Sequence, residues 1–95
     1  MRVHWTHRAK TRLKLIHDYI AKDAPLVSRQ VIERLVRRSV QIADFPYSGR
    51  EVPEYQREDL RELIERPYRI IYRIRADRID VITVMHSRQL LPGDL

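Results

Sequence analysis

The stretch that decides the fold is Pro67–Arg88, which reads PYRIIYRIRADRIDVITVMHSR. It is rich in β-branched and aromatic residues, and the short segment Ala76–Arg78 interrupts it as a tight turn would. It therefore predicts a β-hairpin with strands at Arg69–Arg75 and Ile79–Met85. Because side chains alternate between the two faces of a strand, the first strand has an apolar face and a face dominated by arginine. The apolar face holds Ile70, Tyr72 and Ile74, and the other face holds Arg69, Ile71, Arg73 and Arg75.

The first half of the chain predicts a short strand followed by two helices. Arg2–Trp5 alternates polar and apolar residues, and Thr6 suits the N-cap of a helix that runs to about Ala21. The break Lys22–Pro25 places a proline in the first turn of a second helix, which runs to about Asp44. Each helix has an apolar stripe at helical spacing, so the two are expected to pair as an αα-hairpin. The stripes are Ala9, Leu13, Ile16 and Ile20 in the first helix and Val31, Leu35 and Ile42 in the second.

The segment before the hairpin completes the predicted architecture. Residues 45–59 contain two prolines and the first glycine and predict a loop, and Leu60–Glu65 predicts a further strand. The order β-α-α-β-β-β indicates an α+β fold in one domain, residues 1–95, with the αα-hairpin packed on one face of a small antiparallel sheet. The helices must cover the apolar face, so the arginine face is expected to stay open, with Ile71, Ile82 and Val84 exposed on it.

Composition excludes several classes of function. The 95 residues include no cysteine, which excludes disulfides, thiol chemistry and cysteine-based zinc sites. No apolar run reaches the roughly 18–20 residues that cross a membrane, and the start lacks the apolar core of a signal peptide, so a cytoplasmic protein is expected. The spacing of His4, His7 and His17 is not that of a metal site, and no cofactor is expected.

The net charge of +6 is unevenly distributed along the chain. Residues 1–50 contain 11 Lys/Arg and 4 Asp/Glu, for a net charge of +7, whereas residues 51–95 contain 8 and 9, for a net charge of −1. A basic surface of this kind suits nucleic acid or an acidic protein equally well. A nucleic-acid-binding module that uses the basic helices is therefore one class that stays open.

Several short motifs follow one another along nearly the whole chain. They are Trp5–Thr6 with Ala9, Asp18–Ala21, the break at Asp23 and Pro25, Phe45–Pro46, Gly49–Arg50, Leu60–Leu63, Tyr68–Arg73 and Val84–Arg88. In this order and spacing they closely resemble the RelE/ParE superfamily of bacterial toxins from type II toxin–antitoxin modules. The resemblance implies a toxin that a cognate antitoxin neutralises. It also implies one of two mechanisms, because RelE-like members cleave messenger RNA on the ribosome without a metal and ParE-like members inhibit DNA gyrase.

The residues distinguish these branches in part. Cleavage of RNA needs an acid, a base and cations on the phosphate. In a RelE-like endoribonuclease, Arg69 and Arg73 would hold the phosphate, and His86 would serve as acid or base. The candidate bases are Glu51, Glu54 and Glu62. However, no tyrosine follows His86 and all three lysines lie in or directly after the first helix, which departs from the cleaving branch. The chain resembles the ParE branch more, which implies a gyrase inhibitor that blocks replication rather than an enzyme.

In the ParE-like interpretation, the arginine face is a surface for protein partners, since arginine suits multidentate contacts with carboxylates. The residues predicted for partner binding are Arg50, Arg69, Ile71, Arg73, Arg75, His86 and Arg88. The expected antitoxin is ParD-like, with an acidic segment that folds on binding, and the two proteins would form a hetero-oligomer. Two other roles stay open, because the arginines could pair across strands with Asp80 or Glu62, and His86 could simply bond a carbonyl.

Overall fold

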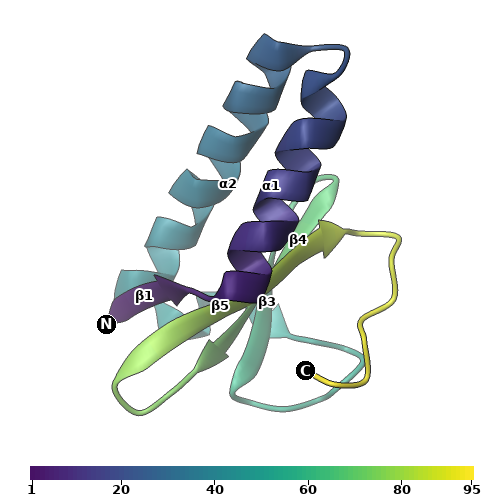
Figure 1. Ribbon diagram of the computed structural model, residues 1–95. Helices are drawn as coiled ribbons and strands as arrows, with labels where there is room; N and C mark the ends of the chain where they lie inside the picture. Colours follow the sequence, from purple (N-terminus) through teal and green to yellow (C-terminus); the bar gives the residue numbers. More distant parts are fainter.

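The computed structural model describes all 95 residues, and its strands and helices follow the predicted order (Figure 1). The elements are β1 (Arg2–Trp5), α1 (His7–Ala21), α2 (Pro25–Asp44), the 3₁₀ helix η1 (Pro46–Ser48), β2 (Arg50–Glu51), β3 (Leu60–Glu65), β4 (Tyr68–Ile74) and β5 (Arg78–His86). Thr6 caps α1 as predicted, because its side chain accepts a hydrogen bond from the Ala9 N–H. The short elements η1 and β2 lie in the segment that was predicted to be a loop.

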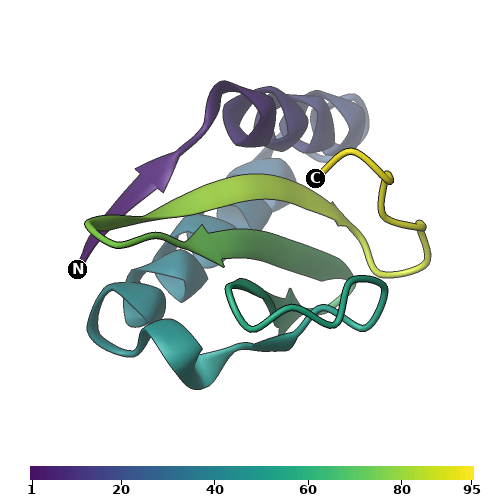
Figure 2. The ribbon, with the colours of Figure 1, turned by 90° about the horizontal axis from the view of Figure 1, so that it is seen from below.

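The five strands form one sheet in the order β1-β5-β4-β3-β2. The hairpin strands are antiparallel, but β1 runs parallel to β5, with Trp5 opposite Val81. The sheet is therefore mixed, which corrects the predicted all-antiparallel sheet. No hairpin turn joins β1 to β5, so local turn chemistry does not set their relative direction. Figures 1 and 2 show the two helices together on one side of this sheet.

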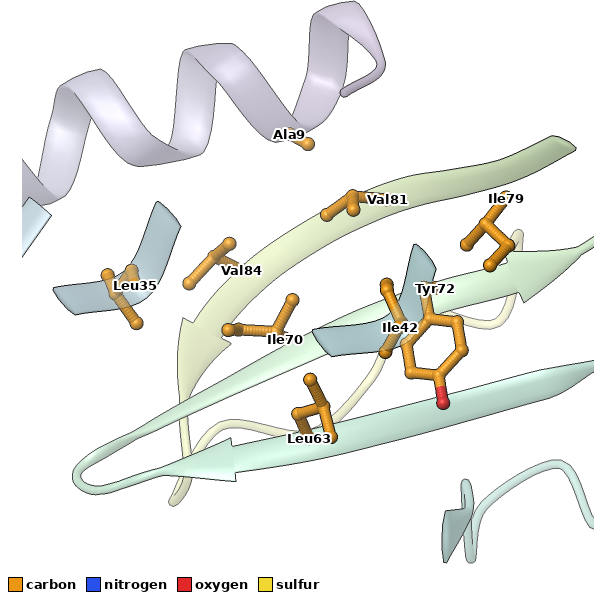
Figure 3. Packing of buried hydrophobic residues seen from close by; sticks show 9 residues of the cluster. All are labelled: Ala9, Leu35, Ile42, Leu63, Ile70, Tyr72, Ile79, Val81 and Val84. Atoms are coloured by element: carbon orange, nitrogen blue, oxygen red, sulfur yellow. The ribbon is translucent and has the colours of Figure 1, made fainter. Parts of the chain in front are cut away.

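The main core lies between the helices and the sheet (Figure 3). It consists of Ala9, Leu35, Ile42, Leu63, Ile70, Tyr72, Ile79, Val81 and Val84, with Trp5 and other half-buried residues packed against it. Ile70 and Tyr72 face the helices, as the alternation predicted. The period-two pattern of β4 and the stripes of the helices therefore gave the correct inner faces.

A bulge in β5 changes which of its side chains face the helices. Ile71 pairs with Thr83 and Tyr72 pairs with Val81, so Ile82 has no opposite residue. The extra residue shifts the alternation by one position. Val84 consequently packs in the helix-side core, and its predicted exposure on the other face is wrong.

The second face of the sheet is not open. The β2–β3 loop and the C-terminal segment pack on it around a second cluster made of Val52, Leu60, Ile71 and Met85. Tyr55, Ile82, Leu91 and Leu95 surround this cluster. Ile71 is 0% exposed, so its predicted exposure is wrong, because the loop and the C-terminal segment bring apolar side chains of their own. None of the helices has the length and apolar character needed to span a membrane.

Candidate partner-binding surface

Arg69, which was predicted to lie on an open recognition face, is buried at the centre of an ion-pair network. Its Nη2 lies 2.6 Å from Oε2 of Glu62, and its guanidinium donates two bonds of 2.9 Å to the Glu54 carboxylate. Arg50 binds the other oxygen of Glu62 at 2.8 Å. The hydrogen bonds from Arg69 lower the pKa of Glu54 to about 2. Arg69 lies on β4 and Glu54 lies in the β2–β3 loop, so the bonds between them hold the loop onto the sheet. Arg69 is only 5% exposed beneath this loop.

Asp80 organises a second group of charges at the other end of the hairpin. Its carboxylate lies 2.6 Å from Arg75 Nε, 2.8 Å from Arg78 Nε and 3.2 Å from His4 Nδ1. Burial alone would raise the pKa of Asp80, but the hydrogen bonds from Arg78, Arg75 and His4 outweigh it and lower that pKa to about 2. Pairing of the hairpin arginines across strands, one of the roles left open by the sequence, is therefore what the structure shows for Arg75.

The three residues considered for RNA cleavage are not assembled into one site. Arg69 is bound between two carboxylates, and Arg73 is 4.0 Å from Asp59, with its Nε buried and without a hydrogen-bond partner. His86 instead stacks edge-on against Tyr68, with ring centroids 6.1 Å apart, and its Nδ1 accepts a bond from the Arg88 N–H. No three histidine or acidic side chains converge as a metal site would require.

An apolar groove lies between α1 and the second half of β5. This α1–β5 groove has a volume of about 380 Å³ and is lined by Arg12, Leu15, Ile16, Tyr19, Tyr68, Val84, Met85, His86 and Gln89. Leu15 and Tyr19 lie one turn apart on α1 and are 53% and 78% exposed. Large apolar side chains this exposed beside a groove are typical of a site where a protein partner binds.

The groove borders a strand edge that lacks a neighbour. β1 pairs only with Arg78–Val81, and Thr6 then donates to the carbonyls of Val81 and Ile82. From Thr83 onward, β5 has a neighbouring strand on the β4 side alone. A free strand edge next to an apolar groove can accept a peptide segment by both backbone pairing and side-chain burial.

Of the residues predicted for partner binding, His86 lines this groove, and the backbone N–H of Arg88 donates to His86 Nδ1. Arg50 and Arg75 are exposed but paired with acids, Arg73 is half-buried, and Arg69 and Ile71 are buried. Sequence reasoning missed Leu15 and Tyr19. The signal was present, because these two apolar residues lie at i, i+4 spacing beside the stripe that forms the core face of α1.

The chain is similar to known proteins in both sequence and fold. Residues 3–91 match the family described as ParE toxin of type II toxin–antitoxin system, parDE. A candidate toxin from Sinorhizobium fredii, Y4kP, is 39% identical over 93 residues, which cover 96% of this chain and 93% of that protein. A solved structure of a chromosomal ParDE system from P. aeruginosa superposes with a TM-score of 0.77 at 20% identity, over 90% of this chain and 95% of that one, and it shares the fold.

Proposed function

The chain belongs to the ParE toxins of type II toxin–antitoxin systems, and from this premise we propose that it inhibits DNA gyrase, blocks replication and is neutralised by a cognate antitoxin. It would act in the bacterial cytoplasm, where gyrase works. The observation that carries the proposal for the antitoxin is the α1–β5 groove with its exposed Leu15 and Tyr19.

The groove suits a ParD-like segment that folds when it binds. An amphipathic segment would place apolar side chains between Leu15 and Met85, and its acids would meet Arg12 at the groove and Arg88 near its end. The unpaired edge of β5 offers backbone hydrogen bonds to the same segment. We assign the antitoxin contact to this groove and to His86 and Arg88, and the network around Arg69 to support of the sheet beneath the loop.

Inhibition of gyrase is favoured over cleavage of messenger RNA by the state of the arginines on the hairpin. Arg69 forms ion pairs with Glu54 and Glu62, and Arg75 forms one with Asp80, at 2.6–2.9 Å. These arginines therefore do not form a free cationic cluster that could bind a scissile phosphate. His86 lies in the groove beside Tyr68, separate from these pairs. Separate ion pairs and a histidine in an apolar groove suit a surface that binds proteins, and such a surface needs no catalytic group.

The test is to assay the purified toxin in parallel for inhibition of gyrase and for cleavage of messenger RNA on ribosomes. We expect loss of supercoiling or accumulation of gyrase-dependent DNA breaks, with the message intact, and we expect prior addition of the cognate antitoxin to abolish the effect. Cleavage of ribosome-bound message with gyrase unaffected would overturn the proposed target. Failure of the antitoxin to protect gyrase would overturn the proposed neutralisation.

A further inference from the structure

The cations of this molecule fall into two groups that differ in how they are paired. Arginines of strands β2 to β5, of the β2–β3 loop and of the β4–β5 turn lie within 4.0 Å of carboxylates, and several of these pairs are as short as 2.6–2.9 Å. Cations of the helical half have fewer acids to pair with, since that half has a net charge of +7. The unpaired positive charge is therefore concentrated on the helices and not on the arginine-rich hairpin Pro67–Arg88.

Three arginines of α2 gather where the helix passes the β3–β4 turn, and the turn itself carries a fourth, the exposed Arg66. We name the α2 arginine patch as Arg34, Arg37, Arg38 and Arg66. The first three line a hollow of about 260 Å³ with Gln41 and Glu65, and this hollow contains no apolar residue. Arg34 Nη2 donates to the Arg66 carbonyl at 3.2 Å, which places the turn beside the helix.

Glu65 is the only carboxylate within 4.0 Å of an arginine of this patch. Glu65 lies 3.7 Å from Arg34 Nε and 3.7 Å from Arg38 Nε, which is too long for a hydrogen bond. Arg37 and Arg66 have no carboxylate within 4.0 Å and are exposed. Most of the positive charge of these four arginines is therefore not paired with a carboxylate.

We infer that the α2 arginine patch binds the phosphate backbone of duplex DNA, a contact separate from the antitoxin groove. Arginine is the cation best suited to phosphate oxygens, because its planar fork donates two parallel hydrogen bonds. Arg34 to Arg38 spans about 6 Å of helix axis, and Arg66 widens the patch across the turn. Duplex DNA carries one charge per about 1.7 Å of its axis, so several phosphates can meet these four groups.

The chemistry of the patch favours DNA over an acidic protein segment. A segment that folds on binding needs apolar anchors to offset the cost of ordering, and the hollow between these arginines offers none. The α1–β5 groove provides such anchors, and it lies beside β5, whereas the patch lies beside β3. The groove and the hollow share no lining residue, so the patch is a surface distinct from the groove.

The experiment measures binding of the free toxin to a labelled duplex of about 25 base pairs by fluorescence anisotropy over a range of salt concentrations. The variant is Arg37→Gln with Arg66→Gln, two exposed residues that make no ion pair. The matched control is Arg2→Gln with Lys10→Gln, which removes the same charge from exposed and unpaired residues elsewhere. Near-identical circular dichroism and melting curves for the three proteins establish that each is folded.

We expect the patch variant to bind the duplex at least about tenfold more weakly near 0.1 M salt, with a salt slope smaller by about two, and the control to change by less than about threefold. Equal losses in the two variants would overturn the proposal, because they indicate a general charge effect. Absence of DNA binding by the unaltered toxin at low salt would also overturn it. So would patch-dependent binding of poly-glutamate that is tighter than binding of DNA. No gyrase is present, so failure here leaves the proposed target untouched.

Discussion

Gly49 and Tyr72 meet where the chain has no room for another side chain. The Gly49 N–H donates to the Tyr72 hydroxyl at 3.0 Å, and that hydroxyl donates to the Pro46 carbonyl at 2.7 Å. Burial raises the pKa of Tyr72, which keeps the phenol protonated as a donor. One buried hydroxyl thereby fastens η1 and the start of β2 to the middle of β4.

The substitution Gly49→Ala should destabilise the protein by about 1–3 kcal/mol. A Cβ at this position would lie 2.5 Å from the Glu62 carbonyl oxygen and 2.5 Å from the Tyr72 hydroxyl, and the first of these is backbone of β3, which cannot move aside cheaply. Urea unfolding followed by circular dichroism measures the change. Gly93→Ala is the control, because a Cβ there meets nothing within 4 Å. Equal stability of the two variants would contradict the close approach.

At the scale of elements, the sequence was enough to predict the buried face of each helix and strand whose apolar residues recur at a regular period. The apolar stripes of α1 and α2 and the alternation of β4 identified the core. Burial of one face produces a helical repeat in a helix and a repeat of two in a strand. The face on which Val84 lies could not be predicted in this way, because the bulge at Ile82 shifts the alternation of β5 by one residue and the sequence does not reveal the bulge. The burial of Ile71 could not be predicted for a different reason. It depends on the β2–β3 loop and the C-terminal segment, whose sequences have no apolar periodicity that would place them on the sheet.

The candidate site was predictable to a smaller extent than the fold. Strand alternation correctly put Arg69 and Arg73 on the face away from the helices, but it cannot reveal that Glu54, in a loop, returns to bind Arg69. The groove is built from α1 and the end of β5, and their proximity follows from the parallel pairing of β1 with β5. Only a tertiary structure contains that information.

The substitution Leu15→Asp should weaken binding of the cognate antitoxin at least about 30-fold, or roughly 2 kcal/mol, because it places a charge in an apolar groove that must be desolvated. Leu26→Asp is the matched control, since Leu26 is 67% exposed on α2 and does not line the groove. Isothermal titration calorimetry with purified antitoxin measures both affinities. A comparable loss for the two variants, or none for Leu15→Asp, would show that the antitoxin binds elsewhere.

Across the whole molecule, ion pairs join segments that are far apart in the chain. Arg8 binds Asp94 at 3.0 Å, and His4 binds Asp80 across 76 residues. The Arg8 pair is exposed, so it should contribute little to stability. Asp80 is different, because its side chain is 6% exposed and it joins β1 to the β4–β5 hairpin. The response of the fold to acid should therefore depend on Asp80 and on Glu54, whose pKa values are both about 2.

The sign of this response follows from the lowered pKa of Asp80. Its contribution is present above the ordinary pKa of 3.8 and is lost as the pH falls toward about 2, because the unfolded chain takes up the proton first. Asp80→Asn should cost on the order of 2 kcal/mol at pH 7, and this difference from the unaltered protein should shrink steadily between about pH 4 and pH 2. Urea unfolding at each pH measures it, with the exposed Asp44→Asn as control. A difference that stays constant with pH would mean that Asp80 acts by packing rather than by charge.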